Sequence, residues 1–286
     1  MTRFQNGLFV LATDHSPPAR RAAREGLALA EALGARVLLA HVVTPFHEGT
    51  EEARAALEAF TAELAPAIPV EQALERGISV EAGVFHLAKQ HEAALLVVGT
   101  HGRTGLRHAL VGSNAERLVQ LAQRPVLCVR PPDDPEAPLH LSAPKRVLCP
   151  VDFSDAARRA CDDALALALH WDAELLLVHV VEPVLVPEAY GLPASQVAVS
   201  LEQEVREAAE SQLRALTAEL SESGAKVRAL IDEGNASHRL TELVSEEDVD
   251  LVVMATRGLT GLEHMLLGST AERVVRRCAC PVLAIK

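Results

Sequence analysis

The sequence is poor in lysine and in long apolar runs, and each shortage excludes a class of protein. Only four of the 286 residues are lysine and the formal net charge is −12, so we expect no general nucleic-acid binding, which needs a basic face. No apolar run reaches the roughly 20 residues that a membrane-spanning helix requires. The first residues lead directly into an apolar strand pattern and leave no room for a secretory signal. We therefore expect a cytoplasmic protein without membrane partners.

Several motifs of well-known chemistry are also missing. There is no Gly-x-x-x-x-Gly-Lys-Ser/Thr run, so a P-loop ATPase is not expected. The Gly-x-Ser-x-Gly elbow of a serine nucleophile is absent. The twelve histidines show neither the His-x-x-x-His nor the Cys/His spacing of a zinc site. We predict no catalytic residue and no metal site built from protein ligands.

The five cysteines are an odd number without the spacing of a disulfide framework. Cys128, Cys149 and Cys280 lie in or beside apolar strand patterns, Cys161 lies in a helical pattern, and Cys278 lies near the end of another. One interpretation is that all five are reduced thiols that act as small apolar residues. The other is that Cys278 and Cys280 form a metal-binding or redox pair.

The chain contains one sequence unit twice. The offset between the copies is 138 residues from Asp14 to Asp152 and 156 residues from Gly102 to Gly258, so the second copy carries a net insertion of 18 residues. The matching pairs are residues 8–16 with 146–154, 36–43 with 174–181, 99–119 with 255–275, and 124–130 with 280–286. We predict two domains, residues 1–130 and 145–286. They are joined by an extended linker at 131–144, which is rich in proline and acidic residues.

Within each copy, strand patterns alternate with helical patterns. The first strand ends at an Asp-x-Ser sequence, where Ser16 before Pro17 predicts a helix N-cap and Ser154 caps the corresponding helix. Strands separated by helices predict an α/β fold with a parallel, doubly wound sheet that binds ligands beyond the carboxyl ends of its strands. In the first copy, the first strand and the first two helices are predicted at residues 7–13, 19–33 and 51–64. In the second copy, they are predicted at 146–151, 156–171 and 201–221.

A glycine-rich loop follows the fourth predicted strand of the first copy. The apolar run Leu95–Val98 leads into Gly99, Gly102 and Gly105, and Gly112-Ser113 precedes the next helical pattern. Glycines let the main chain approach a ligand closely, and the first amides of a helix have no partners within it. Strand, glycine loop and helix start together predict a phosphate site.

The combined spacing, Gly99-x-x-Gly102 and then Gly112-Ser113 after nine intervening residues, resembles the nucleotide-binding motif of the universal stress protein family. The resemblance covers nearly the whole chain, twice. It implies two five-stranded, Rossmann-like open sheets with strand order 3-2-1-4-5. It further implies that the copies form an intramolecular pseudo-dimer through their fifth strands, and a homodimer of the whole chain is compatible with it.

The resemblance also implies roles for individual residues. Asp14 and Asp152 would accept the adenine amino group, and the backbone of Val42 and Val180 would contact adenine. Hydroxyl and amide groups at the start of the following helix would hold the outer phosphates, with Mg²⁺ or Mn²⁺ as a companion ion. The predicted nucleotide-binding residues are Asp14, Val42, Gly99, Gly102, Gly112, Ser113 and Asn114 in the first copy, and Asp152, Val180, Ala255, Gly258, Gly268, Ser269 and Thr270 in the second.

Three features leave alternatives open. Ala255 stands where the motif has its first glycine, and it blocks a ligand only if that position needs a positive φ or close contact. Asp14 and Asp152 are ligand-binding residues or merely helix caps, and a capping role does not exclude contact with a ligand. A structural role is expected for His41 and His179.

The third feature is the insertion at 182–200, which contains Tyr190. It is a lid, a docking flap or a plain loop.

The resemblance implies the function of an ATP-binding universal stress protein that hydrolyses ATP slowly at most and regulates through nucleotide occupancy. One alternative is a scaffold of the same fold that binds no nucleotide and acts through protein contacts. Another is an enzyme that activates a substrate with ATP.

Overall fold

The computed structural model of the protein describes residues 2–45, 49–100, 113–132, 134, 137–183, 194–258 and 267–286, and only the backbone of 113–114 and 194–200. Strands and helices alternate along both copies, as predicted. The first copy contains β1 (Leu8–Ala12), α1 (Pro17–Leu33), β2 (Arg36–Val43), α2 (Thr50–Leu64), β3 (Val70–Arg76), α3 (Val80–Gln90), β4 (Leu95–Gly99), α4 (Ser113–Leu121) and β5 (Val126–Val129). After the short 3-10 helix η1 (His140–Ser142), the second copy contains β6 (Arg146–Pro150), α5 (Asp155–Trp171), β7 (Glu174–Val181), α6 (Ala194–Ser221), β8 (Lys226–Glu233), α7 (Ala236–Glu246), β9 (Leu251–Ala255), α8 (Ser269–Arg277) and β10 (Val282–Ile285).

The ten strands form one continuous sheet in the order β3-β2-β1-β4-β5-β10-β9-β6-β7-β8. Each half therefore has the expected order 3-2-1-4-5, with parallel neighbours. The two five-stranded halves meet through their fifth strands, as the family resemblance implied, and they join into one sheet because β5 and β10 pair in antiparallel fashion, with Val282 opposite Cys128 and Ala284 opposite Val126. Unpaired, each of these strands would expose a row of free amides and carbonyls, and their pairing removes both edges at once.

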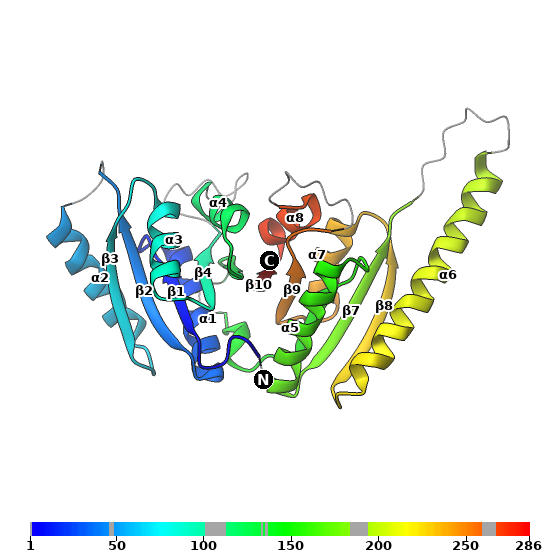
Figure 1. Ribbon diagram of the computed structural model, residues 1–286, viewed down its shortest axis with the longest axis horizontal. Coiled ribbons are helices and arrows are strands. Elements are labelled where there is room, and N and C mark those ends of the chain that lie inside the picture. Colours follow the sequence, from blue (N-terminus) through cyan, green and yellow to red (C-terminus); the bar gives the residue numbers. More distant parts are fainter. Residues whose placement is uncertain are drawn as a thin grey trace.

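The sheet is covered on both faces, which explains why its central strands are continuous apolar runs. The first four residues of β1, β4 and β9 are all buried. One apolar layer contains residues of α1, α2, α5 and α6, and the other contains residues of α3, α4, α7 and α8. In Figure 1 the two halves lie side by side, with α2 and α6 at the outer ends and the C-terminal strand at the centre. Among the described helices, none combines the length and the apolar character that crossing a bilayer demands.

Helix α6 begins earlier than the sequence pattern predicted. It runs over 28 residues from Ala194, so the last seven residues of the insertion are helical and extend the helix predicted from Leu201. The rest of the insertion from residue 184 to 193, with Tyr190, lies outside the described residues.

The segment that joins the two halves is seated on α1 rather than extended throughout. Glu25 is fully buried, and its two carboxylate oxygens each accept a backbone amide at 3.0 Å, one from His140 and one from Leu141. Arg21 pairs with Glu25 at 2.8 Å and donates to the carbonyls of residues 137 and 138. The side chain of Leu141 is buried in the layer beneath. The buried ion pair therefore fixes the joint against the first copy.

The cysteines lie in the two apolar layers. All five are free thiols and all are buried. The Sγ atoms of Cys278 and Cys280 lie 3.7 Å apart, and those of Cys149 and Cys161 lie 3.4 Å apart. In the part of the chain that the structure describes, no three His, Cys, Asp or Glu residues are grouped so that they could hold a metal ion. This arrangement favours the interpretation as small buried residues.

Candidate functional site

The candidate site lies at the carboxyl edge, by which we mean the ends of β1, β2 and β4 in the first half and of β6, β7 and β9 in the second. Open α/β sheets bind their ligands beyond this edge, where the strand order reverses. In each half the reversal lies between the first and fourth strands of the copy, since β1 pairs with both β2 and β4, and β6 with both β7 and β9.

A tight turn follows the first strand of each half. Oδ1 of Asp14 accepts a hydrogen bond from the amide of Ser16 at 3.0 Å, and Ser16 caps α1. Asp152 accepts from the amide of Ser154 at 3.0 Å, and Ser154 caps α5. The predicted serine caps are confirmed, whereas the interpretation of Asp14 and Asp152 as helix caps is wrong. Each aspartate instead occupies the turn between the strand and the cap.

The residue between aspartate and serine is left-handed in both copies, although it is not glycine. The φ angle is +64° at His15 and +62° at Phe153. A non-glycine residue pays roughly 1–2 kcal/mol for this conformation, and such strain tends to occur at functional positions. Sequence reasoning missed both residues, and the repeated Asp-x-Ser is the only signal that marks them.

Two histidines hold the ends of the first strands in place. Nδ1 of His41 lies 2.8 Å from the carbonyl oxygen of Thr13, and Nδ1 of His179 lies 2.7 Å from that of Val151. A carbonyl oxygen only accepts, so each Nδ1 carries the proton and donates it. The prediction of a structural role for His41 and His179 is confirmed.

Val42 lies where the ladder between β1 and β2 has ended. The amide of Thr13 donates to the carbonyl of Ala40 at 2.9 Å, just before Asp14. Because alternate residues of a strand face the same neighbour, the amide and carbonyl of Val42 point past the end of β1. The same alternation places the amide and carbonyl of Val180 beyond the end of β6. The backbone of Val42 therefore borders the space beside Asp14, and that of Val180 borders the space beside Asp152.

The start of the second glycine loop closes onto an aspartate. A Cβ atom at Gly258 would approach Oδ2 of Asp152 more closely than the 3.0 Å that real Cβ atoms keep. A methyl group at residue 258 would therefore displace the carboxylate of Asp152, which lies at the end of a flexible side chain. The corresponding Gly102 of the first copy lies outside the described residues, as does Gly112.

Gly99 has a packing reason for being glycine. A Cβ atom there would lie 2.9 Å from the carbonyl oxygen of Pro18, in the first turn of α1, and the φ angle at Gly99 is not positive. In the second copy Ala255 packs against the apolar layer that contains α5, and its φ angle is not positive. The structure therefore accommodates the methyl group of Ala255 without a left-handed backbone.

The N-terminus of α8 lies beside the same edge. The amide of Gly268 donates to the carbonyl of Thr256 at 2.8 Å, which ties the start of α8 to the end of β9. Gly268 is the N-cap and provides no side-chain hydrogen bond, so no cap side chain occupies the first amides, at Ser269 and Thr270. Such amides favour an anion. In the first copy α4 begins at Ser113, and the side chains of residues 113–114 are not described.

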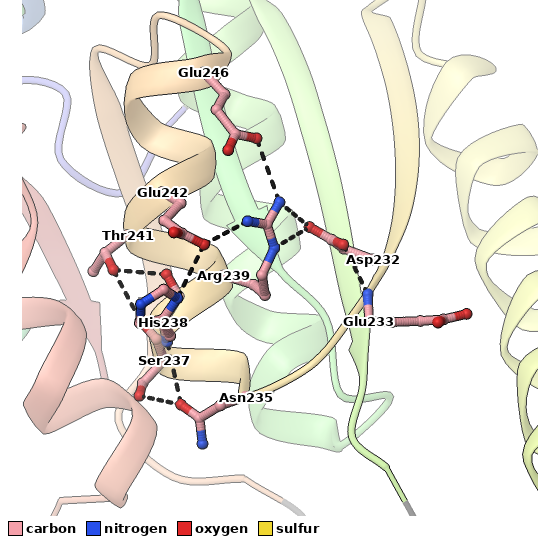
Figure 2. A network of polar contacts seen from close by, with 9 residues as sticks. All are labelled: Asp232, Glu233, Asn235, Ser237, His238, Arg239, Thr241, Glu242 and Glu246. Carbon is pink, nitrogen blue, oxygen red and sulfur yellow. Dashed lines mark hydrogen bonds and ion pairs between the residues drawn. The ribbon is translucent and has the colours of Figure 1, made fainter.

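A polar network holds the end of β8 against α7 (Figure 2). The guanidinium of Arg239 donates to Asp232 at 2.8 Å, to Glu242, and to Glu246 at 3.4 Å, while Asn235 caps α7. Hydrogen bonds to Asp232 and Glu242 raise the pKa of Arg239 above its usual value. The charge of this arginine is thus satisfied by its own half.

The two halves support their edges differently. Oε1 of Glu182, two residues after Val180, accepts from the amide of Ala236 at 3.1 Å and ties the end of β7 to the start of α7. The first copy has Thr44 at the position of Glu182 and Gly83 at that of Arg239. The edge of the second half is therefore braced by the ion pairs of Arg239 and the hydrogen bond of Glu182, and the first copy has neither side chain at the equivalent positions.

Comparison with known proteins gives one consistent result. Residues 8–130 and 144–286 each match the model of the universal stress protein family. A universal stress protein of Methanocaldococcus jannaschii is 34% identical over 142 residues, which cover 50% of this chain and 82% of that protein. Another universal stress protein, from Thermus aquaticus, is 35% identical over 142 residues, which cover 50% of this chain and 98% of that protein. The crystal structure of a universal stress protein from Archaeoglobus fulgidus has the same fold, with a TM-score of 0.75 at 21% identity over 99% of both chains.

Proposed function

Because the chain belongs to the universal stress protein family, we propose that each half binds ATP at the carboxyl edge and that occupancy of the two sites sets the shape of the chain or its choice of partner. The observation that carries the proposal is the close contact between Gly258 and the carboxylate of Asp152, beside the end of β6. A carboxylate and a glycine loop side by side provide an acceptor for a base and a close backbone approach for a phosphate.

The adenine end of the ligand is assigned to the strand ends. Asp14 and Asp152 accept the amino group of the ring, and the backbone groups of Val42 and Val180 meet the ring edge. The turn after each first strand orients the aspartate for this role, because Oδ1 accepts the backbone amide two residues on.

The phosphates are assigned to the glycine loops and to the starts of α4 and α8. Their negative charge suits the first amides of a helix, and the exposed Arg257 adds a positive charge beside the second loop. The remaining proposed contacts are Gly99, Gly102, Gly112, Ser113 and Asn114 in the first half, and Ala255, Gly258, Gly268, Ser269 and Thr270 in the second. Mg²⁺ or Mn²⁺ would bind chiefly through the phosphate oxygens, as Mg²⁺ commonly does.

ATP bound in this way should turn over slowly. Neither glycine loop contains a lysine, and neither carries the Gly-Lys-Ser/Thr sequence of a P-loop. We assign the protein a binding and regulatory role, carried by two units at 1–130 and 145–286 that meet through β5 and β10, and a homodimer of the whole chain is part of the proposal.

The test is to denature the purified protein and to identify the released nucleotide by chromatography. The expected content is about two ATP per chain, with Gly102→Asp and Gly258→Asp each removing one. One ATP, lost only with Gly102→Asp, would confine the function to the first half. No nucleotide, and no ATP binding by calorimetry afterwards, would contradict the proposal and leave the scaffold alternative.

A further inference from the structure

A row of packed aromatic and imidazole rings, ending at Arg20, lies between α1 and α2 in the first copy. The rings of His41 and His15 stack with centroids 4.4 Å apart, and the ring of Phe60 lies 5.3 Å from that of His15. The guanidinium of Arg20 lies over Phe60, 5.7 Å from its centroid, and pairs with Glu63 at 2.8 Å. Phe60 is only 3% exposed, so its ring is the buried centre of the row.

The second copy repeats this row with one member changed. Phe153 takes the place of His15, and its ring lies 4.7 Å from that of His179. Arg158 takes the place of Arg20 and pairs with Glu219, the equivalent of Glu63. Leu216 on α6, however, stands where the first copy has Phe60. The ring at the centre of the row is therefore missing.

An open pocket of about 390 Å³ lies at this place, between α5 and α6. Phe153 and Arg158 both line it, as do Leu216 and Val151, while Gln212 and Glu219 contribute polar atoms. Its volume falls within the range of small-molecule sites, roughly 300–1,000 Å³. The first copy thus shows, with its own side chain, what kind of group such a row accepts.

We propose that this pocket is a binding site for a small planar aromatic compound that carries a polar substituent. The ring stacks on Phe153 and lies beneath the guanidinium of Arg158, as Phe60 lies between His15 and Arg20. Gln212 and Glu219 bind the polar substituent. Neither Asp152 nor Gly258 lines the pocket, although Phe153 does, directly after Asp152. This site therefore adjoins the proposed nucleotide site but shares none of the residues assigned to it.

The test uses indole as the probe, titrated into the full-length protein and followed by calorimetry. We expect one indole per wild-type chain. Leu216→Phe places a ring in the pocket and should weaken binding at least tenfold, whereas Leu201→Phe, at an exposed position of the same helix, should leave it within twofold. Phe60→Leu opens the equivalent space in the first copy and should add a second binding event.

The proposal is overturned if indole does not bind to the wild type, or if the non-aromatic cyclohexanol binds equally well. It is also overturned if a Leu216→Phe variant with an unchanged circular dichroism spectrum binds indole within twofold of the wild-type affinity. Displacement of indole by ATP in a competitive manner would also overturn it, because the pocket would then belong to the nucleotide site. Should Leu216→Phe not fold, Phe153→Leu decides: about fivefold weaker binding supports the stacking role, and unchanged binding contradicts it.

Discussion

Gly258 and Asp152 lie so close together that the space between them has no room for a methyl group. Oδ1 of Asp152 also accepts from the amide and the hydroxyl of Ser154, at 3.0 and 2.6 Å. The Gly258→Ala substitution should rotate the aspartate away from these partners. We expect ATP affinity of the second half to fall at least tenfold by calorimetry while the first half is unaffected. Unchanged affinity in both halves would show that the position of Asp152 does not matter for binding.

The buried carboxylate at the joint should be among the most sensitive positions for stability. Glu25→Ala removes the partner of Arg21 and the acceptor of two amides at residues 140 and 141. Breaking a buried ion pair typically costs about 3–5 kcal/mol, and we expect a loss of about 3 kcal/mol in the free energy of unfolding by denaturant titration. Glu31→Ala, exposed on the same helix, should change it by less than about 0.5 kcal/mol. Equal effects would mean that the joint is not held in this way.

The C-cap of α2 offers a stabilising substitution. Ala65 has a φ of +44° and is exposed, so a glycine there loses no packing and removes the strain. We expect Ala65→Gly to raise the free energy of unfolding by about 0.5–1 kcal/mol. The matched reverse change is Gly34→Ala at the C-cap of α1, where φ is +63°, and it should lower stability by about 1 kcal/mol. Thermal unfolding of both variants checks that Ala65→Gly is more stable, and Gly34→Ala less stable, than the wild type.

Lys286 should make the contact between the halves depend on pH. Its ammonium donates to the carbonyl of Val119 in the first half. Burial lowers the pKa of Lys286 to about 8, with a smaller contribution from the charge of Arg257 and an opposing one from Cys128. Between about pH 8 and the usual lysine pKa, the unfolded chain binds more protons than the folded one, so stability rises with pH in this window.

We expect the difference between wild type and Lys286→Met in the free energy of unfolding to change by about 1–2 kcal/mol between pH 7.5 and pH 10, after allowance for solvent screening of this half-buried group. Denaturant titrations at the two pH values provide the measurement. A difference that stays constant would contradict the lowered pKa.

The elements that could be predicted from sequence are those that depend on local pattern or on the repeat. The apolar run Leu95–Val98 is a strand because both faces are covered, and Ser16 and Ser154 are caps because their side chains satisfy free amides. The offset between the copies placed the two Asp-x-Ser turns at equivalent positions of the fold. These signals need no knowledge of distant contacts.

The features that could not be predicted depend on which distant groups meet. The meeting of β5 and β10 was expected only from the family resemblance, and no local pattern shows that Glu25 accepts the amides of His140 and Leu141. The close approach of Gly99 to the backbone of Pro18 is likewise a contact between residues distant in sequence, which is why Ala255 could not be judged from sequence. The left-handed φ of Phe153 belongs to the same group, because its side chain gives no reason to expect it.

The central claim is that each half holds one ATP, and the most direct test is calorimetric titration of ATP into the nucleotide-free full-length protein. The account predicts two ATP per chain, with Asp14→Ala and Asp152→Ala each abolishing one site and leaving the other. A titration without binding, or one in which both substitutions leave two sites intact, would contradict it.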